Sequence, residues 1–124
     1  MQLNDVLTLT QSRFVTPDAE LDREVVSAFA SDLMSDVLRY DLAQGLLITG
    51  LTNPQTIRTA EMGDVAAILM VRGKFPLSET IMLATQVGIP ILVTDLIMFE
   101  ACGRLYGAGL LACRRHDGSG QQSG

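Results

Sequence analysis

Polar residues that can bind an anion follow four apolar runs of the chain, at 24–30, 46–49, 65–71 and 89–93. The inner runs are uninterrupted, as in strands that are buried on both faces. The candidate binding residues after them are Ser31, Asp32, Thr49, Gly50, Thr52, Asn53, Arg72, Gly73, Lys74, Thr94 and Asp95. Helix N-termini attract anions, and the two cations add charge for a phosphate or a carboxylate.

The same residues also have a purely structural interpretation. Four of them are typical helix caps: Ser31, Thr52, Asn53 and Thr94. Arg72 and Lys74 are also typical of a solvated turn. Asp32 and Asp95 suit the first turn of a helix, where a carboxylate complements the helix dipole. A metal-binding or acid–base pair of these two aspartates is a further alternative.

No complete catalytic constellation is found in the sequence. The chain has neither a GxxxxGK[ST] loop nor a GxSxG elbow, and the glycines at 103–109 follow a predicted helix instead of a strand. The only histidine, His116, lies in a polar C-terminal run. Acid–base catalysis would depend on Asp, Glu, Lys or Tyr alone, and no sequence motif pairs such groups. We therefore expect a protein that is not an enzyme and has no cofactor.

The composition excludes several classes of partner. A net charge of −5 over 124 residues argues against nonspecific nucleic-acid binding, which needs Lys and Arg to neutralise phosphates. No apolar run reaches the ~18 residues that a membrane span requires. The N-terminus lacks the basic and apolar regions of a signal peptide, so we expect a cytoplasmic protein.

Cys102 and Cys113 are too far apart in sequence to form a CxxC pair. With one histidine and no Cys/His cluster, the chain lacks the ligands of a structural zinc site. We expect two reduced thiols and no bound metal.

Strands alternate with helices along most of the chain. A unit of apolar strand, polar turn, helix and glycine recurs at 24–44, 46–63, 65–88 and 89–107. This order predicts parallel strands joined by right-handed crossovers. We therefore expect one three-layer α/β domain over 1–113, with a mainly parallel sheet of about four to five strands and helices on both faces. The polar, glycine-rich residues 114–124 predict a disordered tail.

Several predicted boundaries involve the candidate residues. Ser31 is expected to cap a helix that runs to about Leu42, after a strand at 24–30. Either Thr52 or Asn53 is expected to cap the helix that ends at Gly63. The pair at 94–95 is expected to cap a last helix at 96–106.

The segments ASDLMSDVLRY, LLITGLTNPQTIRTAEMGDVAAILMVRGKFP and ETIMLATQVGIPILVTDLIMFEACGRLYGAGL resemble the DRTGG-domain family. The resemblance covers roughly residues 3–112 and is carried by the order of elements and by SDLMSDV and GIPILVT. This domain is an accessory module in some phosphate acetyltransferases and CBS-domain pyrophosphatases, and is similar to the N-terminal domain of HPr kinase/phosphorylase. Some stand-alone members are encoded near iron-hydrogenase genes, which implies a link to hydrogenase or energy metabolism.

The sequence departs from the family at its signature. Gly50-Leu51-Thr52 stands where the family has Gly-Asp-Arg, and Val71-Arg72-Gly73 stands where it has Thr-Gly-Gly. Only the two glycines are retained. The family resemblance implies an α/β fold, self-association and a regulatory or ligand-sensing role, without catalysis by this domain.

Two functional hypotheses follow. The first is a non-catalytic regulatory or ligand-sensing module that acts as a homodimer, because 48% hydrophobic residues are difficult for one small domain to bury fully. The last helix, with Met98, Phe99, Cys102 and Tyr106, is a candidate interface, although these residues also suit packing on the sheet. The alternative is a small-molecule binder of a nucleotide or other anion at the carboxyl ends of the strands.

Overall fold

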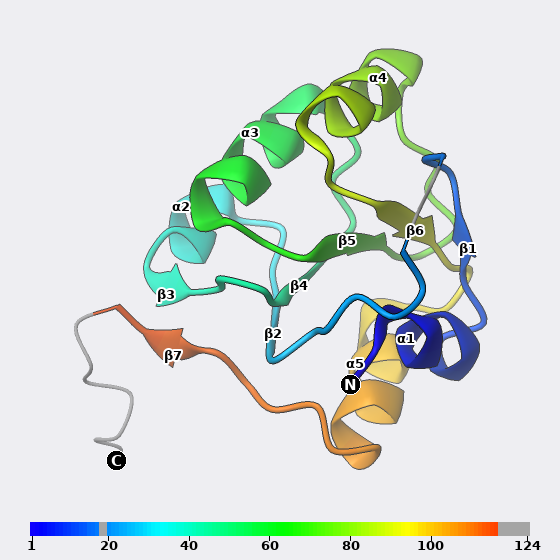
Figure 1. Ribbon diagram of the computed structural model, residues 1–124, viewed down its shortest axis with the longest axis vertical. Helices are drawn as coiled ribbons and strands as arrows, with labels where there is room; N and C mark the ends of the chain where they lie inside the picture. The colour runs from blue at the N-terminus through cyan, green and yellow to red at the C-terminus, as the bar shows by residue number, and fades with distance from the viewer. Residues whose placement is uncertain (18–19, 117–124) are drawn as a thin grey trace.

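The computed structural model describes residues 1–17 and 20–116. Within these residues a five-stranded sheet forms the middle layer, with the strand order β1-β6-β5-β4-β2 (Figure 1). Its strands are β1 (Arg13–Phe14), β2 (Ala28–Ala30), β4 (Leu46–Thr49), β5 (Ala67–Met70) and β6 (Ile91–Val93). All neighbours are parallel except β1, which pairs antiparallel with β6 at one edge. The predicted mainly parallel sheet is confirmed.

Helices cover both faces of this sheet. The helices α1 (Leu3–Leu9) and α5 (Met98–Gly107) lie on one face, below the sheet in Figure 1. The other face is covered by α2 (Met34–Val37), α3 (Pro54–Gly63) and α4 (Ser78–Val87). The three-layer α/β architecture predicted from the alternating pattern is therefore confirmed.

The central strands owe their unbroken apolar runs to this double covering. Every residue of β4 and β5 is buried. Successive side chains of a strand point to opposite faces, so Leu46 and Leu69 join the core under α1 and α5. Their neighbours Leu47 and Ile68 join the core under α3 and α4. Both faces are consequently dry, which favours apolar residues at every position.

The start of α3 shows which of two predicted caps is used. The side chain of Asn53 accepts a hydrogen bond from the backbone N–H of Thr56 at 3.2 Å, and Pro54 occupies the first turn. The carbonyl oxygen of Thr52 instead accepts a hydrogen bond from Thr80 Oγ1 at 2.8 Å. Asn53 is thus the cap, and Thr52 ties α3 to the beginning of α4.

The helix predicted from Ser31 to about Leu42 is wrong in its extent. Only Met34–Val37 is helical, and its N-cap is Leu33. Ser31 Oγ accepts a hydrogen bond from the N–H of Leu33 at 2.9 Å, which forms a local turn before the helix. Asp32 therefore does not lie in a helical turn, and its carboxylate is free to contact a different strand end.

A small second sheet replaces the rest of that predicted helix. β3 (Tyr40–Asp41) pairs antiparallel with β7 (Arg114–Arg115), and the ring of Tyr40 stacks on Phe29 with centroids 4.5 Å apart. The predicted disordered tail from residue 114 is consequently wrong for its first residues. Residues 117–124 of that prediction lie outside the described residues.

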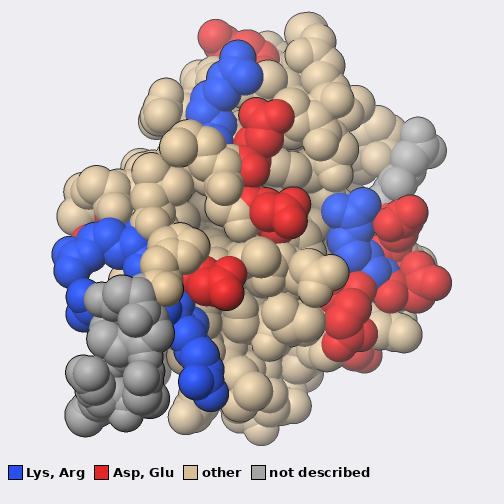
Figure 2. Space-filling model, turned by 60° about the vertical axis from the view of Figure 1, so that its left-hand side comes forward, with Lys and Arg blue, Asp and Glu red and all other residues tan. Residues whose placement is uncertain are grey.

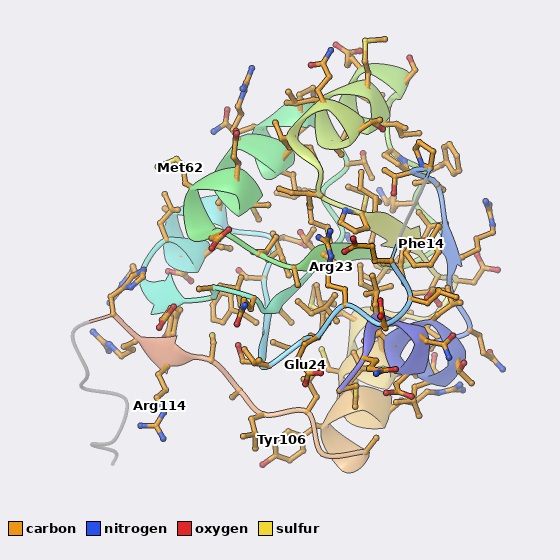
Figure 3. The ribbon with its side chains drawn as sticks, in the orientation of Figure 1. Phe14, Arg23, Glu24, Met62, Tyr106 and Arg114 are labelled. Carbon is orange, nitrogen blue, oxygen red and sulfur yellow. The ribbon has the colours of Figure 1, made fainter. Side chains whose placement is uncertain are left out.

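The strand predicted at 24–30 is shorter than expected, because the residues before β2 have other partners. The backbone N–H of Val25 donates to the carbonyl oxygen of Met1 at 2.7 Å, and Glu24 pairs with the N-terminal ammonium at 2.9 Å. Arg23 donates to the carbonyl oxygen of Ala66 at 3.0 Å; Figure 3 shows Arg23 and Glu24 along this segment. Only residues 28–30 are left to pair with β4.

The predicted capping of the last helix by Thr94 and Asp95 is also wrong. α5 begins at Met98, after Ile97, and has no side-chain cap. Thr94 Oγ1 donates to the carbonyl oxygen of Thr10 at 2.6 Å and accepts a hydrogen bond from the N–H of Leu96 at 3.2 Å. Thr94 thus holds the loop after β6 against the loop that follows α1.

Charged side chains are scattered over the surface in small groups, and uncharged surface separates them on the face in Figure 2. Two ion pairs lie within helical turns or at their ends, Arg39–Asp36 at 3.8 Å and Arg58–Glu61 at 4.0 Å. Both pairs are well exposed, so they contribute little to stability. None of the helices within 1–17 and 20–116 is long and apolar enough to cross a membrane.

Candidate functional site

The carboxyl ends of four parallel strands bring most of the candidate residues to one edge of the sheet. There they separate into two groups. The Asp32 cluster consists of Asp32, Thr49, Gly50 and Arg72. The Lys74 pocket includes Gly73, Lys74, Thr94 and Asp95. Ser31, Thr52 and Asn53 belong to neither group, since they serve the local turns and the helix cap described above.

The Asp32 carboxylate receives hydrogen bonds from three kinds of donor. Its Oδ1 accepts from the backbone N–H of Gly50 at 2.7 Å and from the Thr49 hydroxyl at 3.0 Å. Its Oδ2 lies 3.3 Å from Nη2 of Arg72. The Gly50 hydrogen bond is the main cause that holds the pKa of Asp32 below its usual range. Partial burial opposes this shift, and Thr49 and Arg72 support it, so the carboxylate is ionised at neutral pH.

The loop after β5 places Arg72 against this cluster. Arg72 and Gly73 both have left-handed backbones, each with φ +67°. Their N–H groups donate to the carbonyl oxygens of Leu96 at 2.8 Å and Thr94 at 3.0 Å, so the loop after β6 fixes the turn. A Cβ atom on Gly50 would overlap the Arg72 guanidinium, so only a glycine leaves the guanidinium this position. Local structure therefore explains both glycines retained from the family signature: Gly50 leaves room for the guanidinium, and Gly73 adopts a left-handed backbone.

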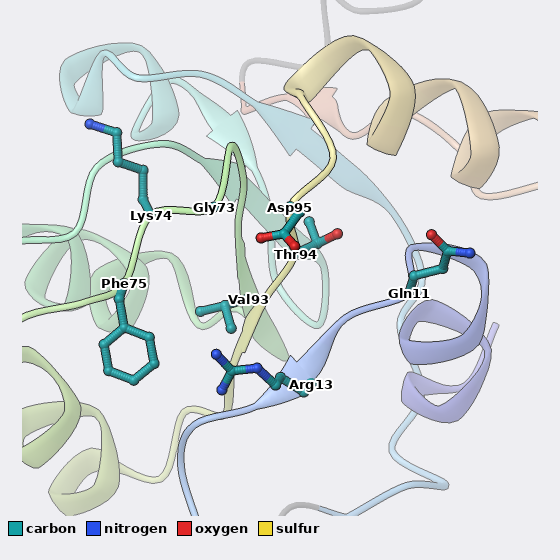
Figure 4. A pocket seen from close by; sticks show the side chains of 8 residues that line it. All are labelled: Gln11, Arg13, Gly73, Lys74, Phe75, Val93, Thr94 and Asp95. Carbon is teal, nitrogen blue, oxygen red and sulfur yellow. The ribbon is translucent and has the colours of Figure 1, made fainter.

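A cavity of about 140 Å³ lies beside this turn, and Figure 4 shows its lining. The residues around it are Gln11, Arg13, Gly73, Lys74, Phe75, Val93, Thr94 and Asp95. The Arg13 guanidinium lies 5.6 Å from the centroid of the Phe75 ring, within cation–π range. In Figure 4 the Lys74 ammonium group points away from Asp95. The cavity thus combines two cations, one carboxylate and an aromatic ring that is 56% exposed.

Four lining residues were not among the candidates from the sequence, namely Gln11, Arg13, Phe75 and Val93, and the first two come from a distant part of the chain. Arg13 lies on β1, which reaches this place only because it pairs antiparallel with β6. Gln11 lies in the turn before β1 and has a left-handed backbone, with φ 51°. No local pattern marks either residue as a partner of Lys74.

The two cysteines are free thiols in the structure. Cys102 packs at the core on one face of the sheet and Cys113 at the core on the other. Burial raises the pKa of Cys102 and is the main cause that raises the pKa of Cys113 to about 11. Both are therefore protonated at neutral pH. Among the described residues there is no group of His, Cys, Asp and Glu that could hold a metal ion.

Comparison with known proteins identifies the type of fold. No family model matches the chain, and no curated protein matches it. The chain is similar to a crystal structure of the CBS and DRTGG domains of the regulatory region of Clostridium perfringens pyrophosphatase, complexed with the activator diadenosine tetraphosphate. The TM-score is 0.67 at 14% sequence identity, and the match covers 82% of this chain and 44% of that chain. The fold is DRTGG/CBS-like. The resemblance found in the sequence is thereby confirmed at the level of the fold.

Proposed function

We propose that this protein is a non-catalytic regulatory module that senses a small anionic ligand at the Lys74 pocket. The observation that carries the proposal is the cavity at the carboxyl ends of the strands, where the Arg13 guanidinium lies over the exposed ring of Phe75 and Lys74 also belongs to the lining. Open α/β sheets bind ligands at this end. The similar pyrophosphatase structure is a regulatory region in complex with a nucleotide activator, which supports a sensing role.

The chemistry of the pocket favours a nucleotide or a similar phosphate-bearing molecule. Arg13 and Lys74 supply positive charge for phosphate oxygens. Phe75 offers a face on which a planar ring stacks, and Asp95 accepts hydrogen bonds from hydroxyl or amino groups. A volume of about 140 Å³ is smaller than a typical site for a drug-sized ligand. The pocket therefore holds one part of the ligand, and the rest lies along the surface.

The state of the aspartates supports a role without catalysis. Asp32 has donors on both carboxylate oxygens and a lowered pKa, so it is a poor general base or acid at neutral pH. Asp95 lines the Lys74 pocket whereas Asp32 is bonded within the Asp32 cluster, which argues against the acid–base pair considered from the sequence.

We further propose that the protein acts as a homodimer through one side of α5, the α5 face, defined by Phe99, Tyr106 and Leu111. These side chains are 84%, 73% and 67% exposed. Beside them, between α5 and the edge strand β2, lies an apolar cavity of about 150 Å³. Exposed aromatic rings next to an apolar hollow are typical of a protein interface. The links to hydrogenase or energy metabolism and to the cytoplasm stay predictions.

A ligand panel in thermal unfolding tests the sensing role. ATP, diadenosine tetraphosphate, pyrophosphate and acetate are added to the wild type, to Arg13→Ala and to Lys74→Ala. A ligand at one hundred times its Kd stabilises the folded state by about 2.7 kcal/mol, and we expect a nucleotide to raise the Tm of the wild type in this way.

Arg58→Ala is the matched control, because Arg58 is a well-exposed arginine on α3, outside the pocket. We expect Arg58→Ala to keep the rise in Tm and the two pocket variants to lose most of it. No rise with any phosphate compound, or an equal rise in all variants, overturns the proposal.

A further inference from the structure

The donors around Asp32 are those that proteins use to bind oxyanions. The backbone N–H of Gly50, the hydroxyl of Thr49 and the guanidinium of Arg72 converge on one carboxylate, at 2.7, 3.0 and 3.3 Å. The glycine is required here because the guanidinium lies where a side chain of residue 50 would be. We propose that Thr49, Gly50 and Arg72 form an oxyanion site that the chain closes with its own Asp32 carboxylate, and for which phosphate or carboxylate ligands compete.

The site is accessible to such a ligand. The side chains of Arg72 and Asp32 are 40% and 39% exposed, so solvent reaches the ion pair directly. A dissolved oxyanion therefore approaches Arg72 without any movement of the core. The site lies outside the Lys74 pocket, and the inference does not depend on ligand binding there.

Asp32 is also able to move away from these three donors. Ser31 is held to β4 by a backbone hydrogen bond from its N–H to the carbonyl oxygen of Ile48 at 3.0 Å, which does not involve the Asp32 carboxylate. The segment that follows buries few side chains, since Leu33 is 57% exposed and α2 contacts the core through the buried Val37 and the partly buried Met34. Displacement of Asp32 thus releases the segment from residue 32 to α2 while the pairing of β2 with β4 persists. Asp32 thus competes with an oxyanion ligand for the same donors. Binding of the ligand changes this segment from its anchored to its released state.

Rescue of Asp32→Ala by added anions tests the inference. Tm is measured in sodium chloride, sodium acetate and sodium phosphate at equal ionic strength and pH 7. We expect acetate or phosphate to raise the Tm of Asp32→Ala by at least about 3 °C more than that of the wild type. Comparison of acetate with phosphate distinguishes a site that prefers carboxylates from one that prefers phosphates. Adding Arg72→Gln to Asp32→Ala should abolish the anion-specific rise.

Asp36→Ala is the control, because it also removes one negative charge, at a position on α2. The substitution breaks only the exposed ion pair with Arg39. If Asp32→Ala is unfolded in chloride, recovery of its circular dichroism in acetate or phosphate is the expected rescue. Asp32→Asn provides a second, near-isosteric variant in which the shift of the Gly50 amide signal on anion addition is followed by NMR. Equal responses of Asp32→Ala and Asp36→Ala, or no shift of the Gly50 amide in Asp32→Asn, overturn the inference.

Discussion

The guanidinium of Arg72 lies against Gly50, in the space that the side chain of any other residue would occupy. This contact joins the loop after β5 to the loop after β4 and places Nη2 3.3 Å from Asp32. An exposed ion pair alone contributes little to stability. The Gly50 N–H and the Thr49 hydroxyl add hydrogen bonds to the charged carboxylate, which are the stronger part of the arrangement.

Gly50→Ala should destabilise the protein by about 0.5–1 kcal/mol, because the added methyl group displaces the guanidinium from Asp32. The backbone of Gly50 is not left-handed, so alanine causes no backbone strain there. In an Arg72→Ala background the same substitution should cost much less. Urea denaturation of the four proteins in this double-mutant cycle measures the coupling.

Gly103→Ala is the control for the glycine substitution. Gly103 lies inside α5, where a Cβ atom meets open space, so alanine should stabilise the protein by about 0.5–1 kcal/mol. An equal loss from Gly50→Ala with and without Arg72 contradicts the proposed contact.

Asp32→Asn should change the dependence of stability on pH. The pKa of Asp32 is lower in the folded protein than its value of about 3.9 in an unfolded chain. The folded state therefore binds fewer protons, and Asp32 contributes stability above about pH 4 that is lost as pH falls through the folded pKa. The difference in unfolding free energy between the wild type and Asp32→Asn should shrink in that window. A difference that stays constant from pH 6 to pH 2 in urea titrations would disagree with this account.

Cys113 should react slowly with iodoacetamide at pH 8. With a pKa of about 11, about one thousandth of the thiol is thiolate at this pH, whereas a free cysteine is far more ionised. In a Cys102→Ser variant, labelling followed by mass spectrometry should be at least about a hundred times slower in the folded protein than in urea. Comparable rates in the two states would show that Cys113 is not shielded.

Phe99→Asp should convert a dimer of the wild type into a monomer at micromolar concentration. Phe99 is 84% exposed, so the substitution leaves the core of the monomer intact. Met62→Asp is the control: Met62 is 71% exposed on α3, and Figure 3 shows it far from Tyr106 of the α5 face. Sedimentation equilibrium distinguishes the species. A monomeric wild type, or a dimer that survives Phe99→Asp and is lost in Met62→Asp, rejects this interface.

Local and periodic features of the sequence were sufficient to predict the central strands and the ends of two helices. The apolar runs at 46–49 and 65–71 predicted central strands, because strands covered on both faces favour apolar residues at every position, and the structure has β4 at 46–49 and β5 at 67–70. Asn53 and Pro54 marked the start of α3 through contacts made within one helical turn. Gly88 marked the end of α4 because its left-handed backbone suits glycine. The apolar runs, the helix cap and the glycine at the helix end can all be recognised from residues that are neighbours in sequence.

Contacts between distant segments decided the rest. Ser31 and Asp32 are typical of a helix start, but Asp32 bonds to Gly50 and Arg72, so the predicted helix shortens to α2. The parallel strands brought the candidate residues to one edge, as the sequence alone predicted. Only the tertiary structure separated them into the Asp32 cluster and the Lys74 pocket and added Arg13 from the antiparallel edge strand. The physical reason is that hydrogen bonds and charges satisfy one another through space, between partners far apart in the chain: Arg72 and Asp32 are separated by 40 residues and Thr94 and Thr10 by 84.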